Sequence, residues 1–269
     1  METNDLNGRS LPETVLLTIR ARNARKAKAT PRKRVHGAEM VVASYNVHKC
    51  IGTDRRFDPE RTARVIREMS PDVIALQEAD NRFGDRAGLL DLARLENETG
   101  LVPVPIIGNG KGHGWRGNVL LFKRGTVRDV HQIKLPGLEP RGALVAEIDL
   151  DEKRSLRVIA AHLGLLRRSR SEQARAVLDI MNRADERPTL LLGDLNEWRL
   201  GNRSALNTLH TTFDPTPPAV PTFPSGLPVL ALDRIMGNRN GMVTALEAHD
   251  TPLSRVASDH LPLTAFVHL

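Results

Sequence analysis

The amino-acid sequence predicts an α/β fold in which two mixed β-sheets pack together, with helices on the outside. Three observations lead to this prediction. Short apolar runs with many β-branched residues recur from residue 39 onward, and their lengths suit buried strands. Helix-like segments separate only the first few of these runs. Later runs are joined by short polar connections such as residues 151–153, so a doubly wound parallel sheet is disfavoured.

Nine segments have the apolar character of strands. Polar or turn-forming residues bound them, as expected where a chain leaves a sheet. A proline-rich stretch at residues 217–228 indicates an irregular loop before the eighth segment. In chain order the predicted strands span residues 40–45, 72–76, 101–107, 118–122, 143–148, 156–161, 189–192, 228–232 and 261–267.

Three segments between these strands are predicted to be helices. Residues 58–60 open the first with an N-cap aspartate, a proline at the first helical position and an early acid, and residues 70–71 close it. The second runs from about residue 87 to 98 and ends at Gly100. The third begins near Ser171, after which apolar side chains follow at helical spacing.

The composition, 40% hydrophobic and 26% charged, is that of an ordinary globular chain and excludes a fibrous repeat or wholesale disorder. The longest apolar run near the N-terminus covers only residues 15–17, which is too short for a signal-peptide core or a membrane span. The single cysteine, Cys50, has no partner for an internal disulfide. We therefore expect a protein of a reducing compartment, the cytoplasm.

The net charge of +7 lies mainly at the N-terminus, because residues 1–38 hold nine basic and three acidic residues. Within residues 20–34, eight basic side chains occur without an acid, and like charges at this density repel one another. We therefore expect a mobile basic arm at residues 1–38 and a folded domain at residues 39–269. The arm would suit nucleic acid or an anionic membrane surface. A solvated tail without a partner is an equal alternative, and no feature implies a stable protein partner.

Polar side chains stand at the ends of the predicted strands. One such residue is usually a turn former or a cap. A set from six strands is better explained by an acidic, polar rim at the floor of one cleft. Buried carboxylates need a cation to offset their desolvation, so this rim predicts a bound metal ion. The side chains are Asn46, Glu78, His162, Asp194, Asn196, Asp233, Asp259 and His260.

The ligand types indicate which metal this would be. Most candidates are hard oxygen donors, whereas cysteine is absent from the set and histidine is a minority. Zinc is therefore disfavoured, and Mg²⁺ or Mn²⁺ is favoured. A hard cation in a carboxylate-rich cleft suits hydrolysis of a phosphate ester. The metal neutralises the phosphate oxygens, and a carboxylate or imidazole activates the water.

Six short motifs carry a resemblance to a known family. In order they are YNVH (45–48), LQE (76–78), AAHLG (160–164), GDLN (193–196), LDRI (232–235) and SDHLPL (258–263). Together they resemble the endonuclease/exonuclease/phosphatase superfamily over roughly residues 40–268. The resemblance implies a four-layered α/β sandwich, divalent-metal-dependent cleavage of phosphate esters, and a catalytic domain at residues 39–269.

The resemblance also implies roles for the individual residues. Glu78 would be the principal metal ligand, with Asn46 and Asp259 near the same ion or a second one. Asp194 would orient or deprotonate the attacking water. Asn196 would hold a phosphate oxygen or support the metal.

Further roles concern the phosphate itself. His260 would be the imidazole at the scissile phosphate, held by Asp233 as a carboxylate fixes a histidine tautomer. His162 stands where the nuclease and phosphatase branches often have a phosphate-binding or acid histidine. Arg141 resembles the family's phosphate-binding arginine, because a guanidinium binds phosphate oxygens in a bidentate manner. A surface ion pair with Glu139 is an equally weighted alternative.

The glycine-rich loop at residues 108–118 leaves further alternatives open. Its His113 and Trp115 either line the cleft or belong to a flexible loop without function, and the second interpretation is favoured. For Asn118, a turn or strand-edge role is as well supported as a role in the site.

Three hypotheses for function follow. The first is a metal-dependent phosphodiesterase or nuclease acting on nucleic acid, and the second a phosphodiesterase or phosphatase acting on lipid headgroups or small phosphate esters. The third is a non-catalytic binding module, which the intact set of polar residues disfavours. Abasic-site repair is disfavoured because His162 replaces the tyrosine of that branch. Six Phe, two Trp and one Tyr also leave little for stacking on unpaired bases.

Overall fold

The computed structural model describes residues 40–81, 84–107, 111–182, 186–199, 203–213 and 219–269 of the 269-residue chain. The basic arm expected at residues 1–38 lies outside these residues. The division into an arm and a catalytic domain therefore stays a prediction.

The first of two mixed sheets has six strands in the order β10-β11-β1-β2-β4-β3. Strand β1 pairs parallel with β2 and antiparallel with β11, so the centre of the sheet mixes both pairings. The strands are β1 (Met40–Asn46), β2 (Val73–Gln77), β3 (Val102–Pro103), β4 (Val119–Phe122), β10 (Val243–Ala248) and β11 (Leu263–Val267).

The second sheet has five strands in the order β5-β6-β7-β8-β9. Only β7 and β8 run parallel to each other, and the other neighbours are antiparallel. The strands are β5 (Thr126–Lys134), β6 (Gly142–Asp149), β7 (Ser155–His162), β8 (Thr189–Asp194) and β9 (Asp233–Gly237).

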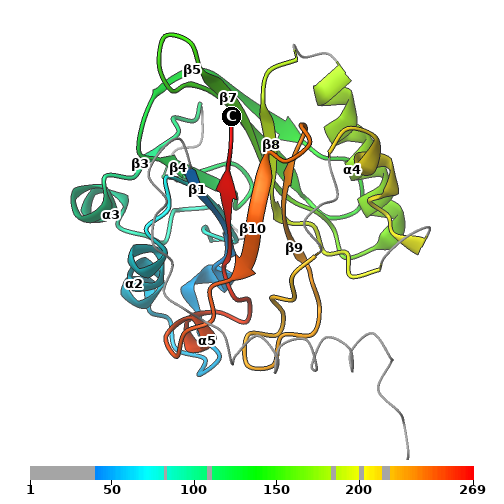
Figure 1. Ribbon diagram of the computed structural model, residues 1–269. Helices are drawn as coiled ribbons and strands as arrows, with labels where there is room; N and C mark the ends of the chain where they lie inside the picture. Colours follow the sequence, from blue (N-terminus) through cyan, green and yellow to red (C-terminus); the bar gives the residue numbers. More distant parts are fainter. Residues whose placement is uncertain (1–39, 82–83, 108–110, 183–185, 200–202, 214–218) are drawn as a thin grey trace, which may run out of the picture. The chain divides into compact units, whose positions relative to one another are not determined.

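Helices cover the outer face of each sheet, which completes the expected four layers (Figure 1). An apolar core lies between the two sheets, and a second core lies between the first sheet and its helices α2 (Pro59–Met69) and α3 (Leu92–Thr99). A third core joins the second sheet to α4 (Arg167–Asn182) and the short 3₁₀ helix η3 (Asn207–Thr211). The short helix α5 (Ser254–Ala257) adds Ala257 to the second core. The sandwich predicted from the sequence is confirmed.

The first predicted helix has the predicted boundaries, and its caps show why. The Asp58 carboxylate accepts a hydrogen bond from the Arg61 backbone N–H at 2.9 Å, which satisfies one of the free donors of the first turn. Ser70 ends α2 in the left-handed conformation, with φ of 49°.

No helix in the described ranges is both long and apolar enough to cross a membrane.

The other two predicted helices begin at different residues. Helix α3 starts at Leu92 rather than near residue 87, because Asp91 caps it and Gly88 is still engaged in a β-bridge with Asp80. Helix α4 starts at Arg167, four residues before the predicted start.

The predicted strands need three corrections. Residues 228–232 form a loop with one bridge between Phe223 and Leu230, and the strand begins only at Asp233. Residues 101–107 contain only the two-residue strand β3, since prolines interrupt the ladder there. Strands β5 and β10 were not predicted. Both are edge strands with one face exposed, so they lack a continuous apolar run.

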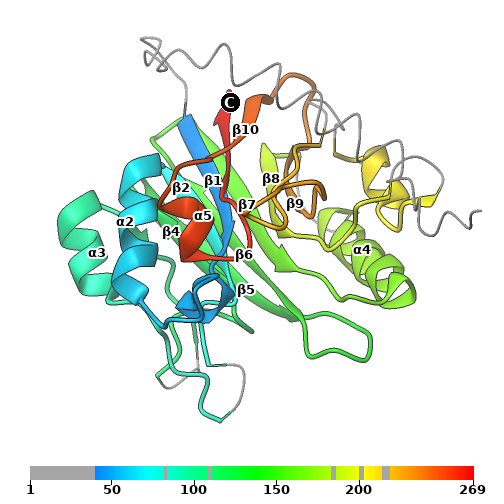
Figure 2. The same ribbon diagram turned by 90° about the horizontal axis from the view of Figure 1, so that it is seen from below.

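Strand directions bring the candidate site residues to one end of the sandwich. The parallel strands β1 and β2 end there, as do β7 and β8. Strands β9 and β11 run antiparallel to β8 and β1, so they begin at the same end. Helix α5 lies at this end, and the C-terminus lies at the other (Figures 1 and 2).

Gly193 is required by the close approach of β7 and β8. Its φ is 150°, and a Cβ placed on it would lie 1.7 Å from the Ala161 carbonyl oxygen. We expect Gly193→Ala to lower the free energy of unfolding by about 3 kcal/mol, because it adds backbone strain to a clash with backbone. Urea denaturation measures this. Gly226→Ala is the matched control, since a Cβ there meets no atom within 4 Å. Equal stability of the two variants would contradict the pairing.

Cys50 is buried against the first sheet, and this environment makes its thiol unreactive. Burial, with a smaller contribution from the Asp58 carboxylate, raises the thiol pKa to about 11. Little thiolate therefore exists at pH 8. We expect an aromatic disulfide reagent to label native protein at least about a hundredfold more slowly than protein unfolded in urea. Fast labelling of the native protein would show that this part of the core is open.

Candidate active site

Asp194, at the end of β8, lies at the centre of the site and is almost fully buried. Its Oδ2 accepts a hydrogen bond from Asn46 Nδ2 at 2.9 Å, which links β8 to the end of β1 in the other sheet. Its Oδ1 accepts from the Asn196 backbone N–H at 3.0 Å. The Nε2 atoms of His162 and His260 lie 3.5 and 3.7 Å from Oδ2. One carboxylate is thus surrounded by donors from both sheets.

His260 and Asp233 form a buried pair in which Nδ1 lies 2.8 Å from Asp233 Oδ2. Burial alone would lower the pKa of His260. The charges of Asp233 and then Asp194 outweigh it, so the pKa is raised to about 10. At neutral pH the ring is an imidazolium, whose Nδ1–H donates to Asp233 while Nε2–H faces Asp194. The Thr222 hydroxyl also donates to Asp233 Oδ2, and the Phe223 ring packs beside the imidazole.

Glu78 follows β2 and has φ of 53°, an uncommon conformation for this residue type. The N–H of the next residue, Ala79, donates to the Gly117 carbonyl at 3.1 Å, which holds the bend. The Oε2 atom of Glu78 lies 3.0 Å from Lys49 Nζ. Burial raises the pKa of Glu78, but the nearby Lys49 ammonium, with a smaller contribution from Arg141, outweighs it and holds the pKa below its usual range. Glu78 is therefore an anion paired with a cation.

Lys49 reaches Glu78 from an unusual turn. His48, Lys49 and Cys50 all have positive φ, between 45° and 57°. The Lys49 backbone N–H donates to the Glu78 carbonyl at 3.1 Å, so the turn is tied to the end of β2. Strained residues of this kind persist where their surroundings enforce them, commonly at functional sites. Lys49 was not predicted as a site residue, although it lies only three residues beyond Asn46.

The other two residues expected near a metal lie beside this turn. The Asn46 Oδ1 accepts from the His48 backbone N–H at 3.1 Å, which fixes the amide with Nδ2 toward Asp194. The Asp259 side chain is partly exposed, and its Oδ1 lies 3.8 Å from His48 Nδ1. The Ser258 hydroxyl donates to the Asn46 carbonyl at 2.7 Å, which anchors the Asp259 segment to β1.

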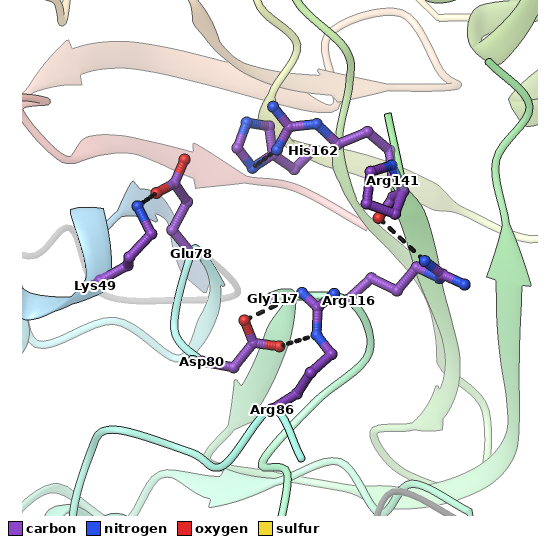
Figure 3. A pocket seen from close by; sticks show the side chains of 9 residues that line it. Lys49, Glu78, Asp80, Arg86, Arg116, Gly117, Arg141 and His162 are labelled. Carbon is purple, nitrogen blue, oxygen red and sulfur yellow. Dashed lines mark hydrogen bonds and ion pairs between the residues drawn. The ribbon is translucent and has the colours of Figure 1, made fainter. Parts of the chain in front are cut away.

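Arg141 forms the ion pair with Glu139 and also lines the pocket, while its phosphate-binding role stays a prediction. Its Nε and Nη2 lie 3.1 and 2.9 Å from Glu139 Oε2, so the ion pair exists. Its Nη1 lies 2.9 Å from His162 Nδ1, and the side chain lines the pocket beside Glu78 (Figure 3). Asn196, in the left-handed conformation with φ of 53°, donates from Nδ2 to the Leu163 carbonyl at 2.9 Å.

The pocket is less acidic than the rim predicted from the sequence. Cations line it as well as carboxylates, and Arg86 binds Asp80 through two hydrogen bonds of 2.8 and 3.1 Å. The sequence missed these residues because Asp80 and Arg86 lie in a connection without a strand-end pattern. The lining side chains and glycine are Lys49, Glu78, Asp80, Arg86, Arg116, Gly117, Pro140, Arg141 and His162 (Figure 3).

The glycine-rich loop contributes Arg116 and Gly117 to the pocket, rather than the residues that the sequence singled out. Asn118 Nδ2 donates to the Trp115 and Gly142 carbonyls, which is a strand-edge role. Trp115 donates from Nε1 to the Ile133 carbonyl at 2.9 Å. The His113 ring lies against Gly88, and burial lowers its pKa.

The donor set fits a hard divalent cation. Within the described segments, no three side chains of His, Cys, Asp or Glu converge closely enough to form a metal centre by themselves. Mg²⁺ does not require this, because it keeps several waters and takes one or two carboxylates. Glu78 Oε2 is buried and makes no hydrogen bond of good geometry among the described residues. Its neighbour is the Lys49 ammonium, so the position already accommodates positive charge.

Comparisons with known proteins agree with this architecture. The sequence model of the Endonuclease/Exonuclease/phosphatase family matches residues 43–260. The chain is 27% identical over 250 residues to YbhP of Escherichia coli (strain K12), which covers 85% of this chain and 96% of that protein.

Solved structures share the fold. An endonuclease/exonuclease/phosphatase from Beutenbergia cavernae DSM 12333 has a TM-score of 0.65 and 24% identity, and the match covers 87% of this chain and 72% of that one. D. rerio TDP2 complexed with single strand DNA product has a TM-score of 0.63 and 16% identity, and the match covers 87% of this chain and all of that one.

The family match spans every one of the strand-end residues from Asn46 to His260. Members of the family are generally hydrolases that act on phosphate esters. The chain belongs to the Endonuclease/Exonuclease/phosphatase family.

Proposed function

We propose that this chain is a divalent-metal-dependent hydrolase of phosphate esters, and specifically a phosphodiesterase. One observation carries the proposal. The carboxylate of Asp194 and the imidazolium of His260 lie 3.7 Å apart in one buried centre. Hydrolysis of a phosphodiester needs a proton acceptor for the attacking water and a cationic donor for the phosphate oxygens, and here the two groups lie side by side.

The roles follow from the charges of the groups. Asp194 would accept a proton from the attacking water, and its hydrogen bond from Asn46 holds the carboxylate in place. His260, kept cationic by Asp233, would stabilise the charge that develops on the phosphate oxygens. The raised pKa of His260 suits this electrostatic role better than that of a base.

Several other donors would bind the phosphate group. Arg141 and His162 line the pocket that contains Glu78, and Arg141 Nη1 contacts the His162 imidazole. The amide nitrogen of Asn196 has a second hydrogen beyond the one directed at Leu163. Arg141 and His162 would bind the phosphate from the pocket wall, and Asn196 from beside Asp194.

Mg²⁺ or Mn²⁺ would be held by Glu78, with Asn46 and Asp259 near the same ion or a second one. When bound, such an ion supplies Lewis-acid neutralisation of phosphate oxygens. Lys49 would then leave Glu78 and become available to an anionic substrate, because one carboxylate oxygen cannot serve both cations equally.

We expect Asp194→Ala and His260→Ala each to lower kcat on bis-p-nitrophenyl phosphate by about 10²–10⁴-fold, as loss of a proton-transfer group or charge stabiliser does. Asp151→Ala and His131→Ala are the matched controls, because both residues are exposed and Asp151 lies in the turn between β6 and β7. Release of p-nitrophenolate in the presence of Mg²⁺ or Mn²⁺ measures the rate. Full turnover in both site variants would refute the assignment.

Metal binding can be tested without turnover. We expect Mg²⁺ to raise the melting temperature of the protein, since a ligand of the folded state stabilises it, and EDTA to reverse the effect. Glu78→Gln should abolish this response. Lys49→Met should tighten Mg²⁺ binding by about tenfold in isothermal titration calorimetry, because it removes a competing positive charge. Unchanged affinity in Glu78→Gln would place the metal elsewhere.

A further inference from the structure

Three loops beside the site present large apolar side chains to solvent. The exposed fractions are 85% for Leu138, 65% for Leu165, 52% for Leu166 and 44% for Trp198. Side chains of this size and exposure are costly to leave in water unless a partner covers them. We refer to these four residues as the apolar rim.

The three loops are connected to one another, so the apolar rim is one surface. The Leu165 backbone N–H donates to Glu139 Oε1 at 2.6 Å, which joins the loop of Leu138 to that of Leu165. Arg170 donates from Nη1 to the Gly164 carbonyl at 3.1 Å, and its guanidinium lies 5.8 Å from the Trp198 ring centroid.

The apolar rim lies at the mouth of the candidate active site. Leu165 comes three residues after His162, and Trp198 comes four residues after Asp194. The loop of Leu138 continues directly into Arg141, which contacts His162. All three loops leave or enter the second sheet at the end where the site residues gather.

Positive charge surrounds these apolar side chains. Arg167, Arg168 and Arg203 are exposed, and the Arg199 guanidinium stacks 4.5 Å from the Trp198 ring centroid. The nearby acids offset only part of this charge. Glu139 pairs with Arg141, Glu172 pairs with Arg168, and Glu197 pairs with Arg170 and Arg199. Arg167 and Arg203 add two further charges, so this surface keeps an excess of positive charge.

We propose that the apolar rim docks onto an anionic phospholipid bilayer. Leucine and tryptophan side chains enter the boundary between headgroups and acyl chains, while arginines around them bind anionic headgroups. Single-stranded nucleic acid fits this surface less well. Aliphatic side chains offer no face for base stacking, and only one of the four residues is aromatic.

The docking has a consequence for the substrate. A bilayer on the apolar rim brings lipid phosphodiesters to the mouth of the pocket that contains Glu78 and Arg141. The substrate class is therefore a phospholipid headgroup ester, and this part of the inference rests on the proposed function. The docking itself does not depend on it.

Tryptophan fluorescence of the full-length protein tests the docking directly. The chain has two tryptophans, and Trp115 packs against the core between the sheets. We expect vesicles of phosphatidylcholine and phosphatidylglycerol (7:3) with brominated acyl chains to quench the Trp115→Phe variant at least twofold. Trp198→Phe should show little quenching. If Trp115→Phe does not fold, the difference between the unchanged protein and Trp198→Phe gives the same readout.

A second pair of variants measures affinity. We expect the double variant Leu165→Ser/Leu166→Ser to bind these vesicles at least tenfold more weakly in sedimentation assays. Leu269→Ser is the matched control. Its leucine is exposed near the C-terminus, at the other end of the sandwich, so its vesicle binding should not change (Figure 1). The basic residues 20–34 are present in every variant and contribute equally.

Several results would overturn the inference. Vesicle binding with no quenching of Trp198 and no loss in the double variant would assign all binding to other basic residues. Loss of a dimer or of DNA binding in the double variant, with vesicle binding unchanged, would assign the apolar rim to a second copy or to nucleic acid. Turnover of bis-p-nitrophenyl phosphate without docking would leave the proposed function standing. Membrane docking together with full turnover in Asp194→Ala would support the docking and refute the proposed active site.

Discussion

The hydrogen bond between Asn46 and Asp194 is the contact on which the site depends. It joins residues 148 positions apart in the chain, at the ends of central strands in different sheets. The apolar core between the sheets holds them together, but hydrophobic attraction is non-directional and tolerates small sliding motions. A buried hydrogen bond does not, because separating its partners leaves both unsatisfied. The bond therefore aligns Glu78 and His260, which the first sheet positions, with Asp194, which ends a strand of the second sheet.

Charge in the site is arranged as local pairs rather than as one acidic cluster. Glu78 faces Lys49, Asp233 faces His260, and Asp80 faces Arg86. Each pair reduces the cost of burying its carboxylate, which explains how the domain folds without relying on a single ion. The same pairs leave cations close to where an anionic ester would bind. A neutral domain can thus attract phosphate through local geometry rather than through a broad basic face.

The sequence predicted the parts of this structure that short-range chemistry determines. The caps of α2 are local, and so are the apolar runs of the central strands, so both were confirmed. Strands β5 and β10 were not predicted, because an edge strand half exposed to solvent has no continuous apolar run. Asp233 was expected at the site rim because it follows an apolar run. It lies there for another reason, since β9 starts beside the end of β8.

Residues that reach the site from irregular connections could not be predicted in this way. Lys49, Arg86 and Arg116 depend on turns whose shape is set by contacts with distant segments. The apolar rim is similar, because the leucines of residues 165–166 look in sequence like the end of a buried strand. Only the structure distinguishes a leucine that faces the core from one that faces solvent.

The parallel pairing of β7 with β8 also bears on how this family can vary. His162 lies opposite Asp194 in that ladder, with Ala161 opposite Gly193 one step before. Side chains alternate between the two faces of a strand, so a shift of one residue would turn either group away from the other. A loop at this edge can lengthen without moving the ladder, whereas a single-residue insertion inside β8 would separate the two groups. The β7–β8 ladder thus fixes the spacing of His162 and Asp194, and the loops above it can differ in length without changing that spacing.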